Sequence, residues 1–319
     1  MLVYTKFMPF FGMMTTSAVA LYVMVVTAST KNLSPFDDPA ISAYRQHIIE
    51  RWSKYYSANL PDHVKIVETP GSFIVALKDF PEKGKTRAGH FEGSRLEASS
   101  NRAVIEGYIE TLKQAYGAGL LSFKALDDWT SQEFTQTLAD KGWISTEAST
   151  IMSIGRQVFP QTDFNRPEYE LRLVSSLEDL KKIAHFHGSS IGFILERMPI
   201  SGLQDGRVTF WAIFSIPDDE CVCSGVFECF DSRTAGVHVV GTDQRHRRKG
   251  LATILMITAI NDAFRRWVGL EMIVLASTPE AVGLYQHLGF RVHGSYQTYK
   301  HITAVTAGPK VNRQLSINQ

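Results

Sequence analysis

Short apolar runs alternate along this chain with segments whose apolar residues recur every three or four positions. The first pattern predicts β-strands and the second predicts amphipathic helices, so the chain is expected to be of the α/β (α+β) class. In the C-terminal half the predicted strands cover residues 169–174, 208–215, 222–230, 236–242, 272–276 and a run that begins at 290, and the predicted helices cover 177–186, 251 to about 269, and 279–288.

The N-terminal half shows the same two patterns. A helix is predicted to open at Asp38 and Pro39, and its apolar stripe is made by Ile41, Tyr44, Ile48, Trp52 and Tyr55 or Tyr56. Further strands are predicted at 63–68 and 72–77, joined as a hairpin, and at 121–125 and 144–154; helices are predicted at 101–116 and 130–141, a surface loop at 82–100 and a linker at 156–167.

The order of elements repeats between the two halves. Residues 111–152 follow the same layout of helix, strand, helix, glycine–aromatic pair and strand as residues 259–300. Two related modules in tandem and an unrelated N-terminal α/β domain both fit this order. We expect the segment from Tyr169 onward to have a hydrophobic core of its own. The expected segments are an apolar stretch at 1–30, an N-terminal α/β domain at 31–160, a C-terminal domain at 166–303 and a tail at 304–319.

The most informative stretch is the turn that joins the strand at 236–242 to the next helix. It carries Arg247, Arg248, Lys249 and Gly250, and no side chain at its end is suited to cap the helix. Uncapped N–H groups and the positive end of the helix dipole favour an anion, and a glycine lets a ligand approach the backbone closely. The turn therefore predicts a diphosphate cradle. The alternatives are a solvated basic turn and a nucleic-acid patch, and apolar flanking elements argue against the patch.

Two motifs in this region resemble those of the GNAT superfamily, the acyl-CoA-dependent N-acetyltransferases. Arg247, Gly250 and Ala252 occupy the three defining positions of the Arg/Gln-x-x-Gly-x-Gly/Ala pyrophosphate loop. Thr278 begins a second stretch that resembles Asn-x-x-Ala-x-x-Leu-Tyr-x-x-x-Gly-Phe, with threonine in place of the asparagine. The resemblance covers about residues 169–301 and implies a GNAT fold, a mixed and mostly antiparallel twisted sheet flanked by helices. Any GNAT-like module in the N-terminal half lacks the loop and is degenerate.

The resemblance implies that acetyl-CoA is the acyl donor and that it binds at this loop. Backbone amides would hold its diphosphate, basic side chains would attract it, and the edge of the preceding strand would hydrogen-bond the pantetheine arm. The residues implied in binding are Val240, Thr242, Arg247, Arg248, Lys249, Gly250, Leu251, Ala252 and Thr253.

Tyr285 and His238 are the catalytic residues that the resemblance implies. Tyr285 matches the tyrosine that protonates the departing thiolate in the family, and a phenol with an ordinary pKa of about 10 suits this role. His238 is expected on the strand face that it shares with Val240 and Thr242. It lies nine residues before Arg247, the spacing at which arylalkylamine N-acetyltransferases place a proton-relay histidine. Core packing is the alternative for both. Glu228 and Asp231 are weaker candidates for the base.

The acceptor is expected to be a primary amine of a small molecule or a peptide. In GNAT modules the segment after the first helix lines the acceptor side, which here is 187–207. Its apolar residues Ile191, Phe193, Ile194 and Leu195 could bind an aromatic or aliphatic group, or they could be core. The oligomeric state stays open.

Composition narrows the other possibilities. The 319 residues are 44% hydrophobic and 20% charged with a net charge of +1, which is globular and gives no reason to expect a nucleic-acid partner. The chain has three cysteines, an odd number: Cys221, Cys223 and Cys229. The first two are expected on one face of a strand. We interpret all three as buried thiols, and we expect no disulfide framework and no bound metal.

The stretch at 7–30 contains no charged residue. A membrane anchor, a signal segment, a packed core element and sequence ahead of a later start such as Met24 all fit it. Because acyl-CoA is made inside cells, we expect a cytoplasmic protein, or an anchored one whose catalytic module faces the cytosol. Two non-enzymatic hypotheses remain: an inactive CoA-binding module, for which Thr278 is the hint, and a membrane-tethered interaction protein on this fold.

Overall fold

The computed structural model describes residues 38–69, 72–77, 89–91, 122–126, 132–160 and 164–301. The apolar run at 7–30, the predicted helix at 101–116 and the predicted tail at 304–319 lie outside the described residues. Within the described ranges, no helix combines the length and the apolar character that crossing a bilayer requires.

The predicted helices and strands that fall within the described residues are present, with bounds that differ from the predictions by a few residues, and two further helices lie at 189–196 and 200–203, where none was predicted. The helices are α1 (Pro39–Glu50), the π-helical turn η2 (Arg51–Tyr56), α2 (Ser57–Asn59), α4 (Gln132–Asp140), α5 (Leu177–His187), α6 (Ser189–Glu196), α7 (Ile200–Leu203), α8 (Leu251–Arg266) and α9 (Val282–His287), with 3-10 turns η5 (Gln244–His246) and η6 (Pro279–Ala281). The strands are β1 (Val64–Thr69), β2 (Ser72–Leu77), β3 (Gly89–Phe91), β4 (Ser122–Leu126), β5 (Trp143–Gly155), β6 (Tyr169–Leu173), β7 (Val208–Ser215), β8 (Cys221–Cys229), β9 (Thr234–Thr242), β10 (Met272–Ser277) and β11 (Arg291–His301). The predicted loop at 82–100 contains β3, which pairs with β2.

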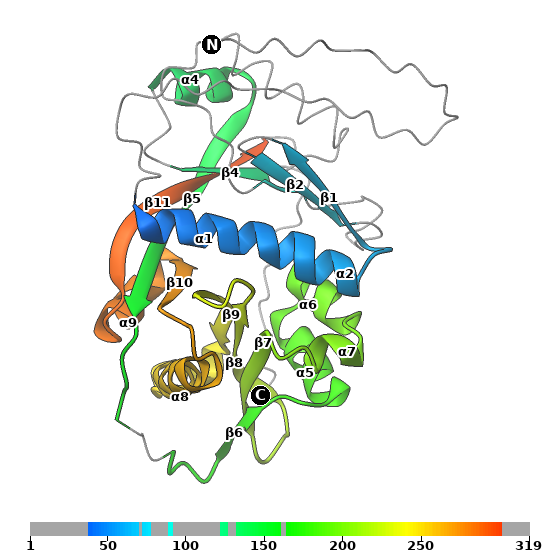
Figure 1. The fold of residues 1–319 in the computed structure, drawn as a ribbon, viewed down its shortest axis with the longest axis vertical. Helices are drawn as coiled ribbons and strands as arrows, with labels where there is room; N and C mark the ends of the chain where they lie inside the picture. Colours follow the sequence, from blue (N-terminus) through cyan, green and yellow to red (C-terminus); the bar gives the residue numbers. More distant parts are fainter. Residues whose placement is uncertain are drawn as a thin grey trace, which may run out of the picture.

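Eight strands form one sheet in the order β4-β11-β5-β10-β9-β8-β7-β6, and β1, β2 and β3 form a second, smaller sheet. Strand pairs in the large sheet are antiparallel except for β9 with β10. Figure 1 shows α1 running across the sheet, with α5, α6 and α7 grouped near β7. The prediction of a mixed, mostly antiparallel sheet flanked by helices is confirmed.

β5 comes from the N-terminal half of the chain but lies inside this sheet. Its Met152 is opposite Leu275 of β10 on one side and Val292 of β11 on the other. The two segments predicted as domains, 31–160 and 166–303, therefore share one sheet. The boundary between these two segments stays a prediction, and the large sheet continues across it.

Each face of the sheet carries its own apolar core. One core joins α1 and η2 to α5, α6 and the strands, with Ile48 and Phe210 among its fully buried members. The other joins α8 and α9 to the opposite face and includes Ile260 and, from β5, Met152. Both cores use residues that precede Tyr169. The expectation of a separate core from Tyr169 onward is therefore wrong.

α1 is fixed at its start by Asp38. Oδ1 of Asp38 accepts a hydrogen bond from the backbone N of Ala40 at 2.7 Å, and Oδ2 lies 2.9 Å from Nδ1 of His293 in β11. The predicted apolar stripe is confirmed, since each of the following residues is buried: Ile41, Tyr44, Ile48, Trp52, Tyr55 and Tyr56.

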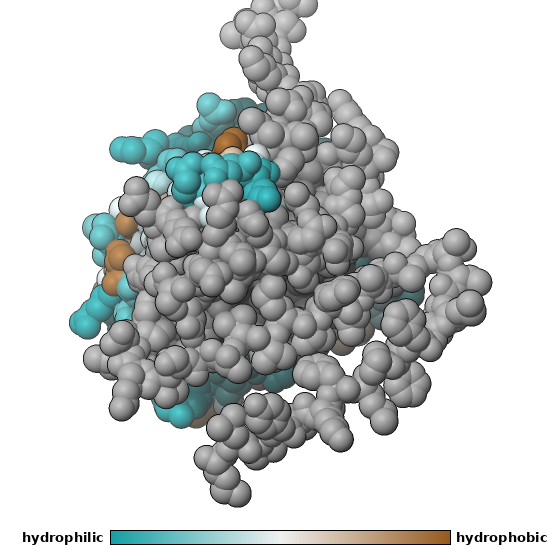
Figure 2. Space-filling view, turned by 90° about the horizontal axis from the view of Figure 1, so that it is seen from above, coloured by the Kyte–Doolittle hydropathy of each residue, from teal (hydrophilic) through white to brown (hydrophobic). Residues whose placement is uncertain are grey.

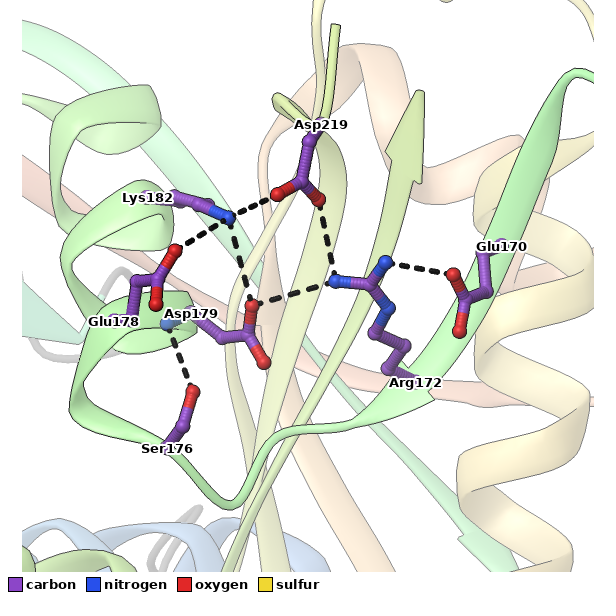
Figure 3. Close-up of polar contacts among 7 residues, drawn as sticks. All are labelled: Glu170, Arg172, Ser176, Glu178, Asp179, Lys182 and Asp219. Carbon is purple, nitrogen blue, oxygen red and sulfur yellow. Dashed lines mark hydrogen bonds and ion pairs between the residues drawn. The ribbon is translucent and has the colours of Figure 1, made fainter. Parts of the chain in front are cut away.

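An ion-pair network connects the start of α5 to the neighbouring strands (Figure 3). Arg172 of β6 contacts Glu170 at 2.6 Å, Asp179 of α5 at 3.4 Å, and Asp219 in the turn between β7 and β8 at 3.3 Å. Lys182 of α5 also pairs with Asp219. Exposed pairs contribute only about 0–1 kcal/mol each. The network's effect is positional, because α5 leads directly into the segment expected on the acceptor side.

The three cysteines are free and buried, as predicted. Cys221 belongs to the core under α1 and Cys223 to the core under α8, so the expectation of a shared face is wrong. A β-bulge opposite Ile213 and Phe214 adds one residue to β8 and reverses the side-chain alternation. Burial raises the pKa of Cys223 to about 12 and that of Cys229 to about 11, which keeps these thiols protonated.

Figure 2 views the molecule from above, and the described residues visible there are mostly hydrophilic. Hydrophobic residues among them occur as separate spots. Single apolar side chains are ordinary on a protein surface. The described part of this face therefore gives no indication of a docking surface.

Candidate active site

The pairing of β9 with β10 ends at the candidate site. Their parallel pairing runs from Thr234 with Met272 to Val237 with Leu275 and ends there. β9 continues to Thr242, and its last five residues are only partly buried. An open strand edge of this kind can hydrogen-bond an extended chain such as the pantetheine arm.

A β-bulge changes the direction of the side chains on β9. The register with β8 shifts by one residue, and Val239 has a φ of 59°. A β-branched residue is strained in this left-handed region, so the surrounding structure must hold it there. His238 and Val239 consequently both contact the α1 side, whereas Val240 packs on the core under α8. The expectation that His238 shares a face with Val240 and Thr242 is wrong for this reason.

The loop before α8 has the geometry of an anion cradle. Gly250 precedes the helix with a φ of 74°, and no side chain caps the helix. The amides of the first turn therefore lack intrahelical acceptors. A Cβ built on Gly250 would meet no atom within 4 Å, so the space in front of the loop is open. Nε of Arg247 donates to the carbonyl of Thr242 at 3.1 Å and ties the loop to the end of β9.

A cavity of about 970 Å³ lies along this loop. The predicted donor-binding residues that line it are Val240, Thr242, Arg247, Arg248, Gly250, Leu251, Ala252 and Thr253. The side chain of Lys249 has a different partner: its Nζ donates to the hydroxyl of Tyr169 at 2.8 Å. That hydroxyl also lies 2.8 Å from Nδ1 of His246, so Lys249 fastens the loop to β6.

A second cavity of about 300 Å³ adjoins the first. Val240, Thr278, Ala281 and Tyr285 line both, so the two spaces meet at these residues. The second cavity is walled mainly by aromatic and aliphatic side chains, with one histidine and one arginine. Its other lining residues are Tyr44, Arg51, Trp52, Tyr56, Ile191, Ile194, Leu195, Val237, His238, Val239, Ala276, Ser277 and Tyr296.

Three of the four apolar residues predicted on the acceptor side, Ile191, Ile194 and Leu195, line this second cavity. The fourth, Phe193, is buried under the guanidinium of Arg197, whose Cζ is 3.7 Å from the ring centroid. The sequence did not resolve which of the four side chains turns into the core, and their place on the acceptor side stays a prediction.

Sequence reasoning missed the contribution of α1 and η2. Tyr44, Arg51, Trp52 and Tyr56 all line the second cavity, although they lie far before the GNAT-like segment. Their spacing indicated only a buried helix face. The signal that could have found them is the aromatic character of that face, because aromatic residues also form the walls of ligand pockets.

Tyr285 stands where the two cavities meet, as its predicted role requires. Only 5% of its surface is exposed, and its ring packs against Phe290 with centroids 5.6 Å apart. Burial raises the pKa of Tyr285 above its usual range, with a smaller contribution from Cys223. The phenol therefore keeps its proton at neutral pH and is available as a donor.

His238 lines the second cavity from β9 and is backed by two buried residues. Its Nε2 lies 3.0 Å from Nε2 of His47 in α1. Oε2 of Glu228 lies 3.5 Å from Nε2 of His47 and 3.9 Å from Nε2 of His238. On the other side, Nε of Arg51 is 3.2 Å from the same oxygen, and Tyr56 donates to Oε1 at 3.3 Å.

Gly236 makes room for this arrangement, because a Cβ at that position would collide with the imidazole of His47. The His47 ring stacks on His238 with centroids 5.2 Å apart and on Phe230 at 5.4 Å. The other weak candidate for the base, Asp231, accepts hydrogen bonds from backbone N–H groups two and three residues on and so stabilises a turn.

The side chains of His47, Glu228 and His238 are of the types that ligate metals, and their ligand atoms lie within 4.8 Å of one another. The carboxylate is already paired with Arg51. A guanidinium at this distance opposes a divalent cation at the same oxygen. The cluster is therefore better described as a hydrogen-bonded histidine pair next to an ion pair.

Thr278, which stands where the second motif has asparagine, lines both cavities. It occupies the N-cap position of η6, but its side chain makes no capping hydrogen bond. A backbone hydrogen bond and one from Thr278 hold the pKa of Glu280 below its usual value. Gly289 has a φ of 88° after α9, as a C′ glycine does.

Comparison with known proteins agrees with this geometry. The model of the acetyltransferase (GNAT) family matches residues 163–290, and this C-terminal part of the chain is a GNAT module. None of the curated proteins compared with the sequence matches it.

Solved structures share the fold at low sequence identity. A GCN5-related N-acetyltransferase from Kribbella flavida is 17% identical over 83% of this chain and 95% of its own, with a TM-score of 0.55. One from Sphaerobacter thermophilus is 13% identical over 84% of this chain and 93% of its own, with a TM-score of 0.51. A tandem GNAT protein from the clavulanic acid biosynthesis pathway is 11% identical over 84% and 96%, with a TM-score of 0.50. The likeness is one of fold, and it extends beyond the C-terminal module into the N-terminal half.

Proposed function

We propose that this protein is an N-acyltransferase that transfers the acetyl group of acetyl-CoA directly to a primary amine. The GNAT module supports acyl transfer from acyl-CoA in general. The observation that supports direct transfer is the meeting of two cavities at Tyr285, one lined by uncapped helix amides and one by aromatic and aliphatic side chains. Direct transfer needs its two substrates in adjoining spaces.

In the proposed reaction His238 takes one proton from the ammonium group of the acceptor. The neutral amine attacks the thioester carbonyl, and a C–N bond forms as the C–S bond breaks. Tyr285 gives its phenolic proton to the departing thiolate, and the resulting phenolate takes the second proton from the new amide nitrogen. One proton per turnover passes to solvent.

The proposed acceptor is a primary amine that carries an aromatic or aliphatic group, free or at the end of a peptide. The walls of the second cavity support this class because apolar side chains dominate them. No acidic residue lines this cavity within the described ranges, so a second cationic group on the acceptor would lack a partner.

The test is release of free CoA thiol from acetyl-CoA in the presence of a panel of arylalkylamines, alkylamines, amino acids and short peptides. Thiol release with the apolar amines is the expected result. A thermal shift with CoA but no thiol release with any amine would indicate a CoA-binding module without catalysis. The absence of both a thermal shift and thiol release would refute acyl-CoA binding.

We also propose that the catalytic module works in the cytosol, where its donor is made. Removing the first thirty residues should leave a soluble protein that still shows a thermal shift with CoA. Full-length protein in the soluble fraction together with an aggregating truncated protein would rule out a membrane anchor at 7–30 and favour a packed core element.

A further inference from the structure

A His–His–Glu cluster is buried directly behind the second cavity, which the proposed function assigns to the acceptor and which is called the acceptor cavity below. His238 lines the cavity, whereas His47 and Glu228 lie behind it and contact His238 from α1 and β8. We propose that His47 and Glu228 are positioning residues that orient the imidazole of His238 and stabilise the proton it takes from the amine. This inference rests on the proposed function, because it presupposes an amine acceptor.

The contact between the two histidines assigns their hydrogen-bond roles. Two Nε2 atoms 3.0 Å apart can share only one proton, so one ring donates and the other accepts. When His238 donates its Nε2–H to His47, its Nδ1 keeps a lone pair for the proton of the amine. As Nδ1 of His238 takes that proton, the Nε2 proton moves to His47. The positive charge then lies next to Glu228.

Glu228 is placed to stabilise that charge. Its Oε2 is fully buried and accepts no hydrogen bond from the residues that the structure describes. A buried carboxylate oxygen without a hydrogen bond is unfavourable, and protonation of the histidine pair places a positive charge on rings whose Nε2 atoms lie 3.5–3.9 Å from this oxygen. The protonated pair is therefore stabilised by a carboxylate that is already in place.

The other charged and titratable groups around the histidine pair affect how strongly the pair holds the proton taken from the amine. Arg51 lies 3.2 Å from Oε2 of Glu228 and opposes a second positive charge, so the proton is released after transfer. Burial raises the pKa of Tyr56 to about 12, and this phenol stays neutral. Glu50, on the same helix as His47, is paired with Lys54 at 2.7 Å. Tyr285, whose pKa burial raises, is neutral as well.

A purely structural role is the competing explanation, because His47 also holds α1 against the sheet. The chain offers a matched control in His293, which ties the start of the same helix to β11 through Asp38 and contacts Ser153. His293 lines neither cavity. His293→Gln therefore loosens α1 without touching the cluster.

The experiment compares wild type, Glu228→Gln, His47→Gln and His293→Gln in the full-length chain, with the CoA-induced thermal shift as the check on folding. Removing the carboxylate should lower kcat about tenfold, leave KM for acetyl-CoA unchanged, and move the acidic limb of kcat/KM for the amine down by about one pH unit. The sign follows because a carboxylate favours the protonated pair, so its loss makes the pair protonate only at lower pH. His47→Gln should lower kcat similarly, whereas His293→Gln should leave the acidic limb in place.

An NMR titration of the imidazole Cε1–H signals in the apoproteins gives a readout that does not depend on activity. The midpoint of the His47 and His238 signals should fall in Glu228→Gln and stay unchanged in His293→Gln. If the midpoint falls while wild type releases no thiol, the cluster is coupled as inferred and the proposed function is wrong. An unchanged midpoint, an unchanged acidic limb in an active enzyme, or a stoichiometric divalent metal that Glu228→Gln loses would each overturn the inference.

Discussion

At the scale of single residues, the position and the pKa of Tyr285 support the same role. It lies at the junction of the two cavities, and burial raises its pKa, so its proton is retained at pH values where a free phenol begins to ionise. A buried phenol beside a departing thiolate is a suitable acid. Core packing alone would not require its position at that junction.

Tyr285→Phe should therefore lower kcat by about 10²-fold while the affinity for CoA changes little, since only a proton donor is lost. In wild type, ionisation of Tyr285 should not reduce turnover until well above pH ~10, because a raised pKa keeps the proton on as pH rises. Steady-state kinetics as a function of pH measure both effects. Tyr55→Phe is the control, because Tyr55 is equally buried but lines neither cavity. Equal turnover in Tyr285→Phe and wild type would show that Tyr285 packs in the core and does not act as the acid.

In the proposed function, Gly250 keeps the space in front of the loop open for the diphosphate. Gly250→Leu should place a side chain in the open space before α8 and abolish the stabilisation by CoA, which in wild type amounts to about 2.7 kcal/mol at a hundredfold excess over Kd. Thermal melting with and without CoA measures the effect. Gly188→Leu introduces at least as much backbone strain, at a φ of 54° and a ψ of −158°, away from the loop, and should keep the shift. A shift that survives Gly250→Leu would place CoA elsewhere.

At the scale of elements, the packing of α1 on β9 brings the N-terminal half to the active site. The contact depends on Gly236, which lets the His47 ring lie against the strand. Aromatic residues from α1 and η2 then close one wall of the acceptor cavity. Two elements far apart in the sequence thus form one pocket.

Gly236→Ala should destabilise the fold by about 1–3 kcal/mol, because the new methyl group displaces His47 from a well-packed site. It should also lower kcat, because His47 can no longer contact His238. Urea unfolding and kinetics provide the two measurements. Gly155→Ala on β5 adds a methyl group where no atom lies within 4 Å and should be nearly neutral. A fully active and stable Gly236→Ala protein would show that α1 can shift without consequence.

At the scale of the whole molecule, the two halves of the chain form a single sheet and share both cores. β5 fills the place between β10 and β11, and α1 covers the face that carries His238. The GNAT module at 163–290 therefore lacks a central strand and one covering helix when it is taken alone.

A fragment that begins at Tyr169 should aggregate, whereas a chain that begins at Asp38 should keep the oligomeric state of the full-length chain and bind CoA. Loss of β5 exposes the edges of β10 and β11, and loss of α1 uncovers an apolar face. Size-exclusion chromatography and thermal melting of the two proteins test this. A monomeric short fragment with a sharp transition and a CoA shift would mean that the shared sheet is dispensable.

The sequence by itself determined the uncapped glycine loop, the positions of its strand and helix, and the placement of Tyr285 on the next helix. These features depend on residues close together in the chain: a glycine that adopts a positive φ, a helix without a cap, and a helix closed by Gly289. Local physical rules therefore suffice to predict them.

Only the tertiary structure decided which residues line the second cavity. His47 and His238 are 191 residues apart, and nothing local to either one indicates the other. The bulge at Val239 reverses the face that period-two alternation assigns to His238, and Val239 is held in its strained conformation where it packs against the core under α1. β5 enters the sheet through pairing with two strands that follow it by more than a hundred residues. Contacts of this range depend on the packing of the complete sheet, which no single segment of sequence specifies.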